Sequence, residues 1–331
     1  MGRMIRIAGL LLLSWTIGTP ARAELPAAAA LLADLGLSAG EIAQVQEGQI
    51  VARRVAATHE RDLATSFAFF APVTPAILVK DLQQGLLLKV DSNTIAGGTI
   101  SAAGTIDDFK GLVLSPGGAV RARRYTGTVD PSLNLSTEER SAFGRLPVTA
   151  PVAEVESHVR QALLARYQAY HAKGLAGIAP FARGAATRSA ADDLRVSLES
   201  LKNLQKHAPN AYAAMLGYPK AQPAGSVSTF KWVHLMAHGA PTIVLVHGLV
   251  VPDGEAFLVM QRQYYVSEGF NGEQAVAGIL PAQGGSIVIY ANHTSTDQVA
   301  GFGGGAKRSI GSKLMASELE GIFAKLQKSA H

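Results

Sequence analysis

The sequence predicts an α+β protein in which a curved antiparallel sheet grips a long C-terminal helix. Three observations lead to this prediction. Runs rich in β-branched and aromatic residues in the C-terminal third are joined by turns too short for crossover helices. The segment 150–217 has the spacing of helices, which indicates a helical insertion between the strands. A final amphipathic pattern at 310–328 predicts the closing helix.

The N-terminus predicts an export signal at 1–23. Arg3 and Arg6 precede an apolar run of 12 residues, 7–18, and a small-x-small motif ends at Ala23. This run is shorter than the roughly 20 residues that a membrane-spanning helix needs. An uncleaved membrane anchor stays open as the alternative interpretation.

We expect cleavage before Glu24, which leaves one domain at 24–331 in a bacterial periplasm. The chain has no Cys, which excludes disulfides, thiol nucleophiles and thiolate zinc sites. The leader holds three Arg and no acidic residue, so the mature chain has 27 Lys and Arg against 25 Asp and Glu. This balance gives no reason to expect a nucleic-acid partner, which would require a clustered basic face.

The first part of the mature chain predicts short helices and a hairpin. We expect a helix at 25–35 and a second one that begins at a capping box formed by Ser38 and Glu41. A third helix begins with Pro75 at its first position. The strands expected here are a hairpin pair, 49–56 and 63–70, and three weaker candidates, 86–91, 99–103 and 120–125.

The helical insertion at 150–217 divides into three helices. The first follows Pro151 and should end at Gly174, because glycine tolerates the left-handed conformation at a helix C-terminus. Ser189 is placed to cap the second helix, and the third covers 208–216.

The remaining strands are long and are separated by tight turns. They are expected at 230–237, 242–251, 256–266 and 286–292. A turn centred on Gly239 and Ala240 would pair His234 with Leu245 and Trp232 with His247. Both faces of this sheet are apolar, so one needs the closing helix as a cover and the other needs the insertion.

One face of these strands is the predicted ligand-binding site. It combines an apolar wall with a few converging polar groups, which is what a pocket for a lipid-like molecule requires. Its candidate residues are Trp232, His234, His247, Met260, Arg262 and Tyr264. The alternative is that Arg262 lies at the margin of the sheet and the other side chains form ordinary core. We therefore expect a binding or carrier protein for a hydrophobic small molecule, with no cofactor.

Other functions stay open as alternatives. His247 or His234 could act as a general base beside Arg262 in an enzyme with the same cavity, or the chain could be an envelope interaction protein with a filled core. His234, His238 and His247 could ligate a metal, but no carboxylate accompanies them on these strands. The strand that ends in His247 and Gly248 is similar to one of the α/β-hydrolases, but the G-x-S-x-G nucleophile elbow is missing.

The C-terminal part resembles a group of exported bacterial proteins of unassigned function. The resemblance rests on Tyr290-Ala291-Asn292-His293-Thr294-Ser295-Thr296-Asp297 and on the Lys307-Arg308-Ser309-Ile310-Gly311 helix start. The order of elements is similar to that of the helix-grip superfamily, which includes START-like lipid-transfer domains and polyketide cyclases. This resemblance implies an antiparallel sheet that encloses an apolar cavity beside a C-terminal helix, and it implies no catalytic residue.

Overall fold

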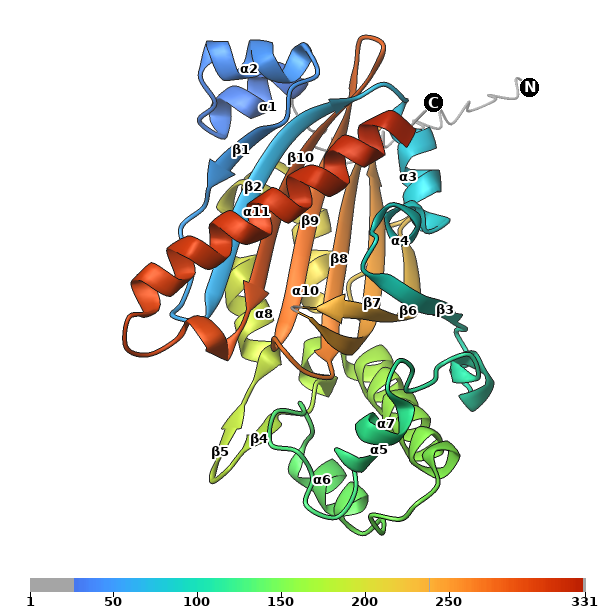
Figure 1. The fold of residues 1–331 in the computed structure, drawn as a ribbon. Helices are drawn as coiled ribbons and strands as arrows, with labels where there is room; N and C mark the ends of the chain where they lie inside the picture. Colours follow the sequence, from blue (N-terminus) through green and yellow to red (C-terminus); the bar gives the residue numbers. More distant parts are fainter. Residues whose placement is uncertain (1–26, 238, 330–331) are drawn as a thin grey trace, which may run out of the picture.

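A computed structural model describes residues 27–237 and 239–329. The expected leader, its cleavage site before Glu24 and the side chain of His238 lie outside the described residues. Within them, the predicted α+β class is confirmed: a curved sheet of eight strands carries a long C-terminal helix on one face (Figure 1).

The sheet is antiparallel throughout, in the order β1-β2-β10-β9-β8-β7-β6-β3. Two residues separate β6 from β7, β7 from β8 and β9 from β10, and five separate β8 from β9; the first two of these turns were predicted from the sequence. The strand bounds are β1 Val51–Arg54, β2 Asp62–Ala71, β3 Thr94–Ile100, β6 Val227–Ala237, β7 Ala240–Asp253, β8 Ala256–Val266, β9 Gly272–Ala282 and β10 Gly285–Ser295. A separate hairpin pairs β4 Phe181–Arg183 with β5 Ala186–Arg188.

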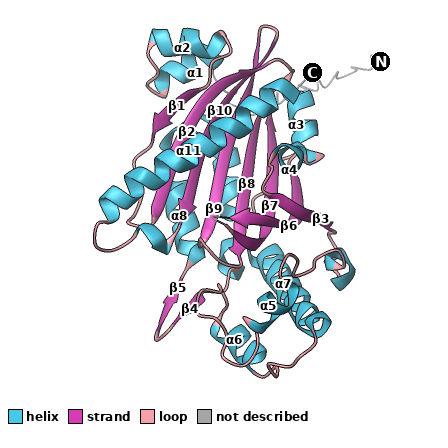
Figure 2. Cartoon of the chain, viewed as in Figure 1, coloured by secondary structure: helices cyan, strands magenta, loops and turns pink. Residues whose placement is uncertain are grey.

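The helices divide between the two faces of the sheet (Figure 2). We call the face beneath α11 the inner face and the opposite one, which α7 to α10 cover, the outer face. The α-helix bounds are α1 Ala28–Asp34, α2 Ala39–Gln46, α3 Pro75–Gln83, α4 Leu86–Val90, α5 Gly118–Arg123, α6 Thr137–Gly144, α7 Val152–Lys173, α8 Ala190–Ser200, α9 Lys202–His207, α10 Pro209–Gly217 and α11 Gly304–Ser329.

The strands are apolar on both faces because both are covered, as the sequence pattern predicted. On the inner face, Phe67 and Phe69 of β2 pack against Phe323 of α11, with ring centroids 5.3 and 4.8 Å apart. On the outer face, Trp232 and Leu245 pack with Tyr167 and Tyr170 of α7. Alternation along each strand therefore decides which helix a residue meets.

Several predicted helix boundaries are confirmed. Ser38 and Glu41 form the reciprocal capping box of α2, and the Ser189 hydroxyl accepts a hydrogen bond from the Asp192 amide at the start of α8. Pro75 occupies the first turn of α3, and α7 ends at Gly174. These features depend on contacts within four residues, so local sequence determines them.

Two of the weaker strand predictions were wrong, and the strands β4, β5 and β9 were missed. Residues 86–91 contain the helix α4, and 120–125 lie mostly in α5; short apolar runs do not distinguish a strand from a helix turn. The candidate 99–103 overlaps only the end of β3, and α11 begins six residues before the expected start. Strand β9 escaped prediction because its Gly, Ala and Pro content is atypical of strands.

The predicted register of the hairpin between β6 and β7 was also wrong, by two residues. His234 pairs with Ile243, and His247 pairs with Phe230, because the strands continue to Ala237 and Ala240. A shift of two residues keeps every side chain on its face, so the predicted grouping survives. A β-bulge after Leu245 then places His247 directly opposite Arg262 on β8.

Candidate functional site

Arg262 lies at the centre of a buried polar network on the outer face. Its Nε donates to Gln274 Oε1 at 2.7 Å, and its two terminal nitrogens donate to the Tyr170 hydroxyl at 3.0 Å and the Met215 carbonyl at 2.8 Å. The side chain is fully buried. All three acceptors are neutral and come from β9, α7 and α10, so the guanidinium ties the helical insertion to the sheet.

His247 continues this network. Its Nδ1 lies 2.9 Å from the Tyr170 hydroxyl, and its Nε2 lies 3.1 Å from the Ser228 hydroxyl. Tyr170 accepts from Arg262, and donation of its own hydroxyl hydrogen to Nδ1 fits a neutral His247. Burial and the nearby Arg262 charge hold the pKa of His247 well below its usual value. Both ring nitrogens therefore have partners within the chain, and the ring is fully buried.

Tyr264, Trp232 and His234 are packed into the same face. The Tyr264 ring stacks on Tyr170 with centroids 3.9 Å apart, although its buried hydroxyl has no hydrogen-bond partner. Trp232 Nε1 donates to the Asp108 carbonyl at 2.8 Å. His234 Nε2 accepts from Arg121 at 2.8 Å, and burial lowers the pKa of His234 to about 4.

Met260 completes the predicted set and belongs to the core beneath α10. The structure thus brings the six candidate residues onto one face, as predicted, but α7 and α10 fill the space in front of them. Their polar groups bind the chain itself, with Tyr264 as the exception. The interior around these six residues is close-packed core.

A cavity of about 340 Å³ opens on the outer face, over β2, β10, β9 and β8. It lies between the N-terminal helix α1 and the segment of α8 and α9, beyond the edge of the packed core. The apolar lining includes Leu31 of α1, Leu35 directly after it and Leu204 of α9, and the floor is formed by Leu258, Val276 and Ile289. This volume falls in the range of small-molecule sites.

The charged residues that line this cavity are all basic or able to become cationic: Arg53, Lys202 and His207. Arg53 extends from β1, directly opposite Ser66 on β2. Its Nη1 atom is buried and has no hydrogen-bond partner among the described residues. A buried guanidinium nitrogen without an acceptor costs free energy unless a ligand supplies one.

The rim of the outer cavity joins two segments that are distant in sequence. Asp34, at the end of α1, accepts from Lys206 at 2.7 Å and lies 2.5 Å from His207 Nε2. Hydrogen bonds from Lys206 and His207 lower the pKa of Asp34. These contacts hold α1 against α9, and they leave Arg53 and Lys202 without an ion-pair partner among the residues described.

Sequence reasoning missed the basic residues of this cavity. Arg53 sits in a strand of four residues, and Lys202 and His207 lie in a helix of six, so neither element has a strong pattern. The local signal was the Arg53-Arg54 pair within an otherwise apolar strand. Nothing in the sequence places this pair opposite α9, because 148 residues separate Arg53 from Leu201.

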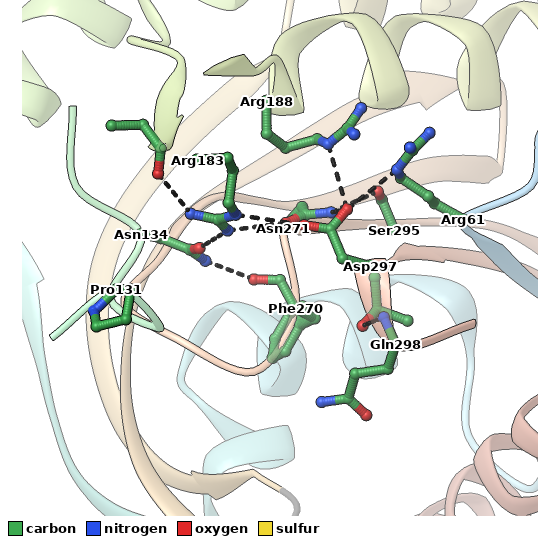
Figure 3. Close-up of polar contacts among 12 residues, drawn as sticks. Arg61, Pro131, Asn134, Arg183, Arg188, Phe270, Asn271, Ser295, Asp297 and Gln298 are labelled. Atoms are coloured by element: carbon green, nitrogen blue, oxygen red, sulfur yellow. Dashed lines mark hydrogen bonds and ion pairs between the residues drawn. The ribbon is translucent and has the colours of Figure 1, made fainter. Parts of the chain in front are cut away.

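The motif that carried the resemblance forms a second polar cluster, at the end of the sheet (Figure 3). Asp297 accepts from Arg61 Nε at 3.0 Å and lies 3.2 Å from Arg188 Nε, while Arg183 and Asn271 complete its contacts. Partial burial opposes the ionised form, but the hydrogen bond from Asn271 and the arginine charges leave the pKa of Asp297 lowered. The cluster fastens the hairpin β4–β5 to the sheet, a structural role.

Among the described residues, no group of three or more His, Asp or Glu side chains could hold a metal ion. In the same part of the chain, no helix has the length and apolar character to cross a membrane. Comparison with known proteins found no matching family model, no matching curated protein and no matching solved structure. The function must therefore be argued from the geometry of the cavities.

Proposed function

We propose that this protein binds or carries an amphipathic anion with an apolar tail, such as a fatty acid, in the outer cavity. The observation that carries the proposal is an apolar space of about 340 Å³ whose lining charges include a buried Arg53 nitrogen without an acceptor. The apolar wall would desolvate the tail, and Arg53 would bind the carboxylate by a charge-assisted hydrogen bond.

The leader-like N-terminus agrees with this proposal, because an export signal would place the carrier in the periplasm. The helix-grip resemblance implies a cavity beside the C-terminal helix, whereas the outer cavity lies on the opposite face of the sheet. A hydrophobic ligand that crosses an aqueous compartment needs shielding from water, because each exposed methylene costs about 0.8 kcal/mol.

The first experiment identifies what the protein contains. Native mass spectrometry and organic extraction of the protein purified from its own host should reveal a co-purifying amphiphile. Isothermal titration calorimetry with dodecanoate below its micellar concentration should then show binding at one site. Longer chains should bind about fourfold more tightly per methylene until the cavity is full.

Two variants locate the site. Arg53→Gln should weaken dodecanoate binding at least tenfold, because a charge-assisted hydrogen bond contributes about 1.5–3 kcal/mol. Ala291→Phe, which fills the cavity from β10, should abolish it. Arg123→Gln is the matched control, since Arg123 is exposed and distant from the lining. Unchanged binding in both site variants, or no binding of any chain length by the wild-type protein, contradicts the proposal.

A further inference from the structure

A second cavity, of about 180 Å³, lies on the inner face between the sheet and α11. Leu319, Phe323 and Leu326 of α11 form its roof, and side chains from seven strands and from α3 line the rest. The sheet separates this inner cavity from the outer one, because neighbouring residues of a strand point to opposite faces. Ala277 thus lines the inner cavity and Gly278 the outer cavity.

The inner cavity contains a carboxyl group that is held in place by two strands. Glu273 of β9 lies directly between Gln263 of β8 and Thr294 of β10 in the register. Gln263 Nε2 donates to one carboxylate oxygen at 2.8 Å, and Thr294 Oγ1 donates to the other at 2.9 Å. Both donors are neutral, so the Glu273 charge has no compensating cation at this position.

A second carboxyl group lines the same cavity. Asp91, in the segment between α4 and β3, is partly buried and borders the cavity together with Glu273. Burial is the main cause that raises the pKa of Glu273, and the Asp91 charge raises it further. Two like charges that share an apolar space repel each other, and a cation between them would relieve this repulsion.

The described lining also has a surplus of acceptors. It includes no Lys, Arg or His, and the buried Gln263 Oε1 and Thr94 Oγ1 atoms have no hydrogen-bond partner. Lys231 lines only the adjoining smaller cavity, where its ammonium group donates to the Gln83 carbonyl at 3.1 Å. The described lining of the inner cavity therefore carries no positive charge, and most of it is apolar.

We propose that the inner cavity is a binding site for a hydrophobic amine, whose ammonium group is held by Glu273 and Gln263 and whose apolar body lies under α11. The ligand of the inner cavity would be a cation, whereas the ligand of the outer cavity would be an anion. The proposal does not depend on the anion site, since the two cavities share no lining residue. The protein would then distinguish cationic from anionic amphiphiles by the face of the sheet on which they bind.

The test uses dodecylamine, with dodecanol and dodecanoate as probes of the same chain length. Calorimetry on the wild-type protein should show dodecylamine binding at least tenfold more tightly than dodecanol at neutral pH. Glu273→Gln keeps the size of the side chain and one acceptor oxygen but removes its charge, and it should weaken dodecylamine binding at least tenfold. Dodecanoate binding should change less than twofold in this variant.

Three further variants complete the design. Asp91→Asn should weaken dodecylamine binding by a smaller factor, and it keeps the proposal testable should Glu273→Gln lose its fold by circular dichroism. Ala277→Phe, which fills the inner cavity, should abolish dodecylamine binding and leave dodecanoate binding intact. Glu255→Gln is the matched control, since Glu255 is exposed in the turn between β7 and β8.

The proposal is overturned if the wild-type protein does not bind dodecylamine or binds dodecanol equally well. It is also overturned if folded Glu273→Gln and Asp91→Asn proteins keep wild-type affinity, or if Arg53→Gln and Ala291→Phe, rather than Ala277→Phe, remove dodecylamine binding. Loss of dodecanoate binding alone would contradict the anion site and leave this one standing.

Discussion

The outer face of the sheet has two regions, which differ in whether their buried polar groups have hydrogen-bond partners. Beneath α7 and α10, Arg262, Tyr170 and His247 bind one another and the nearby chain, and the space is filled. Between α1 and α9, Arg53 lines an apolar cavity, and its buried Nη1 atom has no acceptor among the described residues. A buried polar group with partners in its own chain is explained by stability, whereas one beside empty space indicates a ligand.

The inner face extends this comparison. It also combines a packed region, around Phe323, with a cavity that contains unpartnered polar atoms, but its charges are carboxylates. The linings of the two cavities thus carry charges of opposite sign on opposite faces of one sheet. The predictions below test whether substitutions in the packed region lower the free energy of unfolding and whether substitutions beside the cavities leave it unchanged.

The largest effect is expected from Arg262→Met in the packed region. The variant keeps an apolar stem but leaves three acceptors without a donor: Gln274 Oε1, the Tyr170 hydroxyl and the Met215 carbonyl. Each unsatisfied buried group costs about 1–3 kcal/mol, partly offset by removal of a buried charge, so the free energy of unfolding should fall by about 3 kcal/mol. Urea denaturation followed by circular dichroism measures it.

The control for this variant is Arg123→Met, which should change stability by less than about 0.5 kcal/mol because the side chain is exposed. Dodecanoate binding to folded Arg262→Met protein should match wild type. If the variant instead keeps full stability and loses dodecanoate binding, Arg262 belongs to a ligand site and the division between the two regions is wrong.

The next effect compares one added methyl group in each region of the outer face. A Cβ on Gly98 would lie 2.5 Å from Trp232 Nε1, whose indole is fixed by its hydrogen bond to Asp108, whereas a Cβ on Gly278 would meet nothing closer than 3.5 Å. Gly98→Ala should cost about 1–3 kcal/mol by overpacking. Gly278→Ala should be within about 0.5 kcal/mol of wild type.

Thermal and urea unfolding of the two glycine variants measure this difference. Equal costs would mean that the cavity region packs as tightly as the core around Trp232, and the proposed ligand space would not exist.

The two faces, but not the cavities, could be predicted from the sequence. Alternation placed Trp232 and Val233 on opposite faces, and a register error of two residues left that assignment intact. What covers each part of a face depends on contacts between distant segments, such as Tyr170 against His247. No local pattern indicates that α1 and α9 leave a cavity beside Arg53.

Glu273 shows a second reason why the sequence did not predict a site. Its strand, β9, has few β-branched residues and was not predicted, so its carboxyl group could not be placed on any face. The pairing partners Gln263 and Thr294 were both in predicted or quoted segments. Only the register across three strands brings these side chains together, and register is a property of the whole sheet.

Acid should destabilise the packed region through its neutral histidines. The pKa of His234 is lowered by burial from 6.5 to about 4, so the unfolded chain takes up this proton first as the pH falls. The stability present above pH 6.5 is therefore lost progressively down to about pH 4, with about 2 kcal/mol lost at pH 5.

His234→Gln tests this origin, because an amide oxygen can still accept from Arg121 but cannot take up a proton. Urea denaturation at pH 7 and pH 5 should show about 2 kcal/mol less loss in the variant than in the wild type. His158→Gln, on the exposed side of α7, is the control and should keep the full loss. An identical pH dependence in all three proteins would mean that His234 is accessible to protons in the folded state.

The smallest effect is expected where charges stay partly in solvent, at the Asp297 cluster. Asp297→Asn keeps hydrogen-bonding capacity but removes the charge that Arg61, Arg183 and Arg188 share. Such half-exposed ion pairs contribute little, so the loss in stability should be about 1 kcal/mol or less and should shrink in 1 M salt, where the screening length is about 3 Å. A loss comparable to that of Arg262→Met, unaffected by salt, would show that the β4–β5 hairpin is held as tightly as the packed core. The contrast between exposed and buried polar groups would then not describe this end of the sheet.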